Sequence, residues 1–195
     1  LQSDSDNPDL LIGLGTCLVE RGDLQAGRQT FERVLQKSPN LHTARLALGR
    51  LELKLDHASE AIKLLSPLAT ERSYDSAVRF SLALALQAAG RADEAKEHFQ
   101  FVDKAQRAID RMQFLMDAAK KNPDDAEVRY QIGMICLKYE SPTNGVKWLL
   151  SVLNLQHDHQ STHAALAHYY RSLGNEKLAV EHERQAGDAT ADIRD

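Results

Sequence analysis

The chain has 195 residues, of which 43% are hydrophobic, and a net charge of −4 with an isoelectric point near 6.1. This charge argues against nucleic-acid binding, which needs a basic surface, and no apolar run approaches the ~20 residues that cross a membrane. Cys17 and Cys136 form neither a disulfide framework nor a metal-ligand spacing, so a reducing compartment such as the cytoplasm is favoured.

The predicted elements are all helices, and they are arranged in pairs. Residues 1–7 are polar and without periodicity, so we expect a frayed start. Because the chain begins with Leu1 rather than methionine, we also expect a fragment that lacks its native N-terminus. A first helical hairpin is predicted over 8–41, where apolar residues recur at three- and four-residue spacing and Gly22-Asp23 separates the two helices.

The later elements follow the same pattern of two helices joined by a short turn. Their predicted helices occupy 42–55 and 58–68, 76–89, 126–139 and 142–154, and 160–173 and 176–187. Pro67 is expected to end its helix early, because proline lacks the amide donor that a helix interior needs. The tail 188–195 has no periodicity and is expected to be flexible.

One predicted helix is much longer than the others. Between Arg91 and Asn122 there is no glycine and no proline, and apolar residues keep helical spacing throughout. The sequence therefore predicts a single helix over 92–121, ended by Asn122-Pro123.

Small residues recur at a fixed interval in both helices of the hairpins. The first column holds Gly15, Gly49, Ala83, Gly133 and Ala167, and the second holds Gly27, Ala61, Ala95, Gly145 and Ala179. Both columns advance in steps of 34, 34, 50 and 34 residues. This period is typical of stacked helical repeats, in which small residues mark the points where two helices cross.

The pattern resembles the tetratricopeptide repeat (TPR) family. The first unit carries Leu14-Gly15, Gly22, Gly27, Phe31 and Pro39 at the family's spacing. The resemblance implies an all-α, right-handed superhelical solenoid of five hairpins, with an extended second helix in the third repeat. It implies a single array over 8–187, with repeats near 8–41, 42–75, 76–125 (which contains the insertion), 126–159 and 160–187.

Two columns depart from the family pattern. Where the family often carries tryptophan, this chain has Leu11, Arg45, Arg79, Arg129 and His163. We expect the arginine stems to pack between helices while each head pairs with a neighbouring acid. Glu52 stands where an aromatic residue is usual, which weakens the second repeat.

The resemblance also implies a concave groove lined by the first helix of each hairpin. Its predicted apolar residues are Leu46, Phe80, Leu84, Tyr130, Met134 and Leu137, and its predicted basic residues are Arg50, Lys54, Lys138 and Arg171. The function expected is a non-enzymatic scaffold that binds a protein or peptide with apolar anchors and some acidic residues. Phe80 and Tyr130 are the expected anchors, with the Tyr130 face pointing away from the helix crossings. The alternative is that these residues are core.

Two other functions stay open at this point. The long helix around Ile109, Met112 and Met116 is a candidate for self-association into a homodimer. His159 and His163, four residues apart, are candidate metal ligands. They belong to a group of four with His157 and His168, but histidines without a closed cage of other ligands are a poor metal signal. No catalytic constellation and no phosphate-binding loop is present in the sequence, so we expect neither enzymatic activity nor a cofactor.

Overall fold

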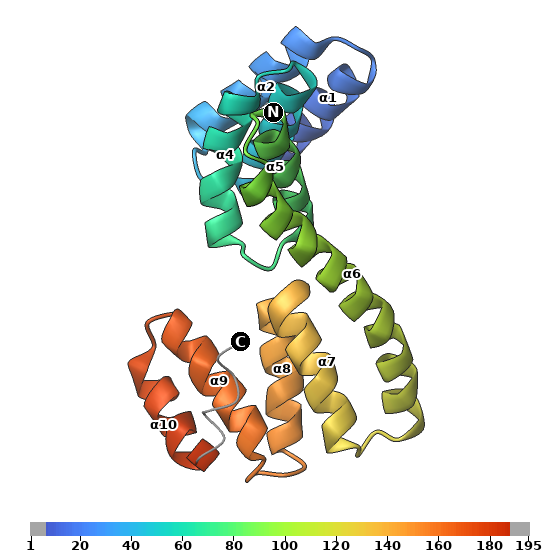
Figure 1. Cartoon of the computed structure of the whole chain (residues 1–195), viewed down its shortest axis with the longest axis vertical. Coiled ribbons are helices and arrows are strands. Elements are labelled where there is room, and N and C mark those ends of the chain that lie inside the picture. The colour runs from blue at the N-terminus through green and yellow to red at the C-terminus, as the bar shows by residue number, and fades with distance from the viewer. Residues whose placement is uncertain (1–6, 188–195) are drawn as a thin grey trace, which may run out of the picture. The chain divides into compact units, whose positions relative to one another are not determined.

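The computed structural model describes residues 7–187, and every regular element in that range is a helix (Figure 1). The predicted tail, and the predicted frayed start apart from Asn7, lie outside the described residues. The helices are α1 (Pro8–Glu20), α2 (Leu24–Lys37), α3 (His42–Lys54), α4 (Ala58–Glu71), α5 (Ser76–Ala88), α6 (Ala92–Lys121), α7 (Ala126–Tyr139), α8 (Pro142–Leu153), α9 (Gln160–Ser172) and α10 (Glu176–Ala186). The predicted all-helical hairpins are confirmed.

The contacts divide the chain into two compact units, Leu1–Lys104 and Ala105–Asp195. The first holds α1–α5 and the beginning of α6, and the second holds the rest of α6 with α7–α10. The predicted long helix is confirmed, since α6 is 30 residues long and crosses the division between the units. The single array over 8–187 stays a prediction.

At six of the helix starts, a side chain accepts hydrogen bonds from the first free backbone amides. Asn7 begins α1 in this way, Asp75 begins α5 and Asp125 begins α7. In the second unit the same role falls to Ser141 at α8, His159 at α9 and Asn175 at α10. These caps place the helix boundaries within one or two residues of those predicted.

The small-residue columns lie where the two helices of a hairpin cross. A Cβ atom added at Gly15 would lie 2.5 Å from Phe31 Cε1, and one added at Gly145 would lie 2.5 Å from the backbone nitrogen of Leu137. A larger residue would therefore force the helices apart. A third column lies at the turn inside the hairpin, where Asp56 (φ 61°) adopts the left-handed backbone that glycine supplies at Gly22, Gly90 and Gly174.

In four of the hairpins, an arginine or histidine at the position where the family often carries tryptophan binds the loop before the hairpin. In each case a side-chain nitrogen donates to the backbone carbonyl six residues earlier. The pairs are Arg45 Nε to Pro39 (2.8 Å), Arg79 Nε to Ser73 (2.6 Å), Arg129 Nε to Pro123 (2.7 Å) and His163 Nε2 to His157 (2.8 Å). The expected pairing of the arginines with an acid is found at Arg45, 3.4 Å from Glu71, and is wrong for Arg79 and Arg129. In these four repeats the loop carbonyl lies within reach of the side chain, and at Arg79 and Arg129 it takes the acid's place.

One predicted helix end is also wrong. Helix α4 does not end at 68 but continues to Glu71, with Pro67 inside it. Pro67 is exposed, and so is Lys63, whose carbonyl loses its helical partner. Leu68 and Ala69, just beyond the proline, are buried, and this burial favours continuation of the helix. Within residues 7–187, no helix combines the length and low polarity of a membrane span.

Candidate functional site

Half of the predicted groove residues lie on α3 and α5 of the first unit. We call Leu46, Arg50, Lys54, Phe80 and Leu84 the α3–α5 face. Phe80 is 44% exposed and Leu84, one helical turn further along α5, is 39% exposed. The Phe80 ring meets the Phe99 ring edge-on, with 5.9 Å between centroids. This contact holds Phe80 in place without covering it.

The cations of the α3–α5 face are held by neutral partners. Arg50 Nε donates to Ser81 Oγ (3.0 Å), and Lys54 Nζ donates to the Val19 carbonyl (3.3 Å). Among residues 7–187 no carboxylate forms an ion pair with Arg50 or Lys54. The charge of Arg50 is therefore held at α5, next to Phe80 in the sequence, and that of Lys54 at α1, and both are left uncompensated.

The other predicted groove residues lie in the second unit, where they pack more deeply. Tyr130, Met134 and Leu137 of α7 are half-buried against a core of Leu149, Ala165 and Leu166. Burial, and secondarily the charge of Glu127, raises the pKa of the Tyr130 hydroxyl. The Tyr130 ring also lies 5.3 Å from the His159 ring. Tyr130 is therefore partly engaged in the packing of this unit, and the expectation that its face points away from the helix crossings stays a prediction.

The two basic residues predicted for the second unit differ from each other. Arg171 is paired with acids, Glu183 and Glu176, on the neighbouring helix α10. Lys138 is exposed, and its Nζ lies 5.7 Å from the centre of the Tyr139 ring. Of these two residues, Lys138 alone presents a charge without an acidic partner among the described residues.

The two histidines considered as metal ligands have other partners. His159 Nδ1 accepts a hydrogen bond from the Thr162 amide (3.2 Å) and so caps α9. His163 is buried, with Nε2 donating to a loop carbonyl and Nδ1 2.8 Å from His182 Nδ1. No lone pair of His163 is left for a metal. In residues 7–187 no group of three or more His, Cys, Asp or Glu residues is arranged to hold an ion.

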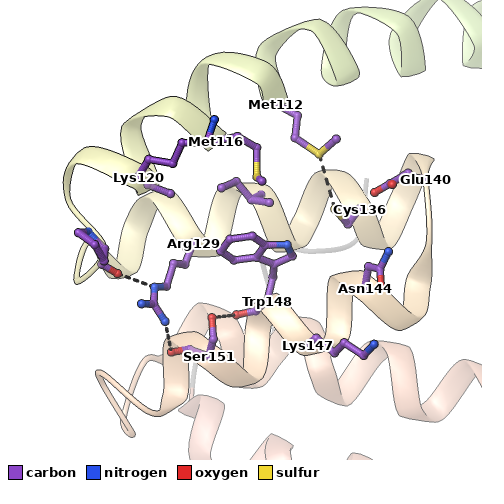
Figure 2. Close-up of a pocket in the computed structure, with 13 residues that line it drawn as sticks. Met112, Met116, Lys120, Arg129, Cys136, Glu140, Asn144, Lys147, Trp148 and Ser151 are labelled. Atoms are coloured by element: carbon purple, nitrogen blue, oxygen red, sulfur yellow. Dashed lines mark hydrogen bonds between the residues drawn. The ribbon is translucent and has the colours of Figure 1, made fainter.

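A pocket that was not predicted lies in the second unit between the end of α6, α7 and α8 (Figure 2). Its volume is about 680 Å³, and its apolar lining includes Met112, Met116, Ile132, Cys136 and Trp148. Its polar lining includes Lys120, Arg129, Glu140 and Lys147. The one available signal was Trp148, the only tryptophan in the chain, three residues after Gly145 of the second small-residue column. Its position against α6 depends on tertiary packing.

The thiol of Cys136 is part of this pocket's floor. It donates to the Met112 sulfur at 3.6 Å, which joins α7 to α6. Burial first, and then hydrogen bonding to Glu140, raises the pKa of Cys136 to about 12. The thiol therefore stays protonated at neutral pH and is a structural group rather than a nucleophile.

Comparison with known proteins gives one family model and several relatives. A model described as tetratricopeptide repeat matches residues 18–73. A curated relative, the protein CTR9 homolog of Arabidopsis thaliana, is 27% identical over 207 residues, which cover 90% of this chain and 19% of that protein. The chain thus spans about a fifth of that relative's length.

Similar solved structures are also repeat proteins. TTC0263, a thermophilic TPR protein of Thermus thermophilus, is 24% identical with a TM-score of 0.42, covering 95% of this chain and 93% of its own. YrrB, described as a TPR protein with an unusual peptide-binding site, is 16% identical with a TM-score of 0.43, covering 97% and 90%. At such TM-scores these likenesses support neither a shared arrangement nor a shared ligand.

The matched segment runs from α1 through α4, which is most of the first two hairpins. The same small-residue columns and the same loop-binding column recur in the hairpins that follow. Residues 18–73 therefore match the tetratricopeptide repeat, and the features of these first hairpins recur along the rest of the described chain.

Proposed function

We propose that this chain is a non-enzymatic protein–protein interaction scaffold that binds a peptide or helix of another protein on the α3–α5 face. The observation that carries the proposal is the exposure of Phe80 and Leu84, 44% and 39%, one turn apart on the same helix. Adjacent large apolar side chains left open to water commonly mark an interface. Repeat arrays of this kind generally act through such surfaces.

The chemistry of the face indicates what the partner carries. Apolar side chains of the partner pack on Phe80 and Leu84, and an acidic residue of the partner meets Arg50. Aromatic anchors at the centre of an interface each contribute ~2 kcal/mol or more, while charges at the rim contribute mainly to the association rate. We include Lys54 as such a rim charge.

The predicted groove residues of the second unit belong to the proposal in a smaller role. Tyr130, Met134 and Leu137 are half-buried, so they offer a partner only part of each side chain. Lys138 supplies an uncompensated charge beside them, and Arg171 supplies less because Glu183 already holds it.

Affinity capture with matched variants tests the proposal. The Phe80→Ala/Leu84→Ala double variant removes the two exposed side chains, and Leu173→Ala removes one that is 62% exposed in the second unit. We expect a set of proteins that bind the native chain and the Leu173 variant but not the double variant. Capture of the same proteins by all three would contradict the α3–α5 face as the binding surface.

A second candidate function is self-association through α6. It is favoured by Phe114, which is 77% exposed on that helix. Met112 and Met116 do not favour it, since both line the pocket against α7 and α8. Sedimentation of the native chain and of Phe114→Ala distinguishes the cases, because a dimer through α6 would dissociate in the variant.

A further inference from the structure

The pocket between α6, α7 and α8 offers a binding site separate from the α3–α5 face. It lies entirely in the second unit, and none of the predicted groove residues lines it. We propose that this pocket docks an apolar side chain of a partner helix or peptide whose neighbouring residues are acidic.

The floor of the pocket suits an apolar anchor. Figure 2 shows the Trp148 indole lying between α7 and α8, with the side chains of Met112 and Met116 reaching toward it from α6. Trp148 is only half-buried, so part of its ring is open to a ligand. Tryptophan is among the residues that contribute most to binding, and methionine side chains adapt to the shape of an incoming group.

The volume exceeds what one packing defect would leave. About 680 Å³ lies within the ~300–1,000 Å³ typical of sites that bury a whole ligand. It accommodates an anchor side chain together with a neighbour on the same face of a partner helix.

The charges around the pocket select the partner. The chain as a whole carries −4, yet the pocket lining has three cations, Lys120, Arg129 and Lys147, against one acid, Glu140. Asp117 pairs with Lys120 at 2.9 Å. Arg129 donates only to the Pro123 and Ser151 carbonyls. These acceptors are neutral, so they do not compensate its positive charge.

Lys147 is exposed, and among the described residues no acid pairs with it or with Arg129. Two uncompensated cations beside an apolar floor are complementary to a partner segment in which acidic residues flank the anchor.

Peptide selection followed by tryptophan fluorescence tests the proposal. Random 12-residue peptides without tryptophan are selected on the full chain carrying Phe80→Ala/Leu84→Ala. Because this variant lacks the exposed side chains of the α3–α5 face, the result tests binding in the pocket independently of the proposed function. Each selected peptide is then titrated while the emission of Trp148 is followed, which reports on the pocket alone because the chain has no other tryptophan. Variants are checked for helix content before use.

We expect peptides with a large apolar residue beside Asp or Glu that shift the Trp148 emission to shorter wavelength. Their Kd should rise ~10-fold in Lys147→Glu, since like charges then meet. It should rise by at least as much in Met116→Glu, and stay unchanged in Lys177→Glu, an equal charge reversal at an exposed site on α10.

Three results would overturn the proposal: selected peptides that leave the emission unchanged, peptides without acidic residues that ignore Lys147→Glu, or no enrichment at all. An emission shift that grows with protein concentration in the absence of peptide would place a second copy in the pocket, and so would also overturn it.

Discussion

At the scale of single residues, Glu52 is a carboxylate in a core position. It is 1% exposed, with Oε1 2.7 Å from Arg28 Nε and Oε2 2.8 Å from His57 Nδ1. The residue thus joins α2 to the turn after α3 through two charged or polar contacts.

We expect Glu52→Gln to lower the free energy of unfolding by about 1–3 kcal/mol, because the neutral amide loses the ion pair with Arg28 and offers one acceptor oxygen where the carboxylate offers two. Urea denaturation followed by circular dichroism measures the change. Glu97→Gln, an equal change at an exposed position on α6, serves as the control and should leave the unfolding curve in place. Equal curves for all three proteins would show that the buried contacts contribute nothing.

His182 makes the last hairpin sensitive to acid. Burial, and then the neighbouring His163, lowers the pKa of His182 from its ordinary value of 6.5. Between that lowered pKa and 6.5 the unfolded chain binds more protons than the folded one, so stability falls as the pH drops below about 6.5. The stabilising contribution is fully present above 6.5.

Hydrogen exchange resolves this effect locally. We expect amides of α9 and α10, corrected for intrinsic rates, to lose protection between pH 7.5 and pH 5.5. His182→Gln should flatten this dependence, since the glutamine amide does not titrate. Protection that is equal at both pH values in the native chain would contradict the prediction.

At the scale of elements, the helix crossings limit which substitutions the hairpins tolerate. A Cβ at Gly145 would lie 2.5 Å from the nitrogen and 2.7 Å from the Cα of Leu137, both backbone atoms of α7. Gly145→Ala should therefore destabilise the chain by ~1–3 kcal/mol through overpacking. Gly13→Ala meets no atom within 4 Å inside α1 and should stabilise it by up to ~1 kcal/mol.

Thermal unfolding of these two variants checks the crossing directly, since the chemical change is the same in both. Opposite shifts of Tm are expected. A Tm for Gly145→Ala at or above that of the native chain would show that α7 and α8 do not cross at this residue.

Most elements could be predicted from the sequence because their signals are local. The absence of glycine and proline between 91 and 122 was sufficient to predict α6. The end of α4 could not be predicted in this way. Whether a proline ends a helix depends on whether its face is exposed and whether the residues after it are buried, and both are tertiary facts.

At the scale of the whole molecule, the candidate site was only partly predictable. Phe80 and Tyr130 occupy the same position in their repeats, yet Phe80 is exposed and Tyr130 packs against α8 and α9. The difference arises because the hairpin that α7 begins is followed by another hairpin in the same unit. In the first unit, α5 begins the last hairpin, and no further hairpin follows it there. The position of a residue in its repeat does not say which helices surround it. The Trp148 pocket also depends on the surrounding helices, so it could not be predicted.

The central claim is that Phe80 lies at the contact with a partner protein. Site-specific photo-crosslinking tests it most directly, with p-benzoylphenylalanine placed at position 80, at 173 as an exposed control, and at 114 on α6. We predict that a partner captured by the native chain is crosslinked from position 80 and not from 173. Crosslinks from 114 to another copy of the chain, with none to any partner from 80, would contradict the α3–α5 face and favour self-association.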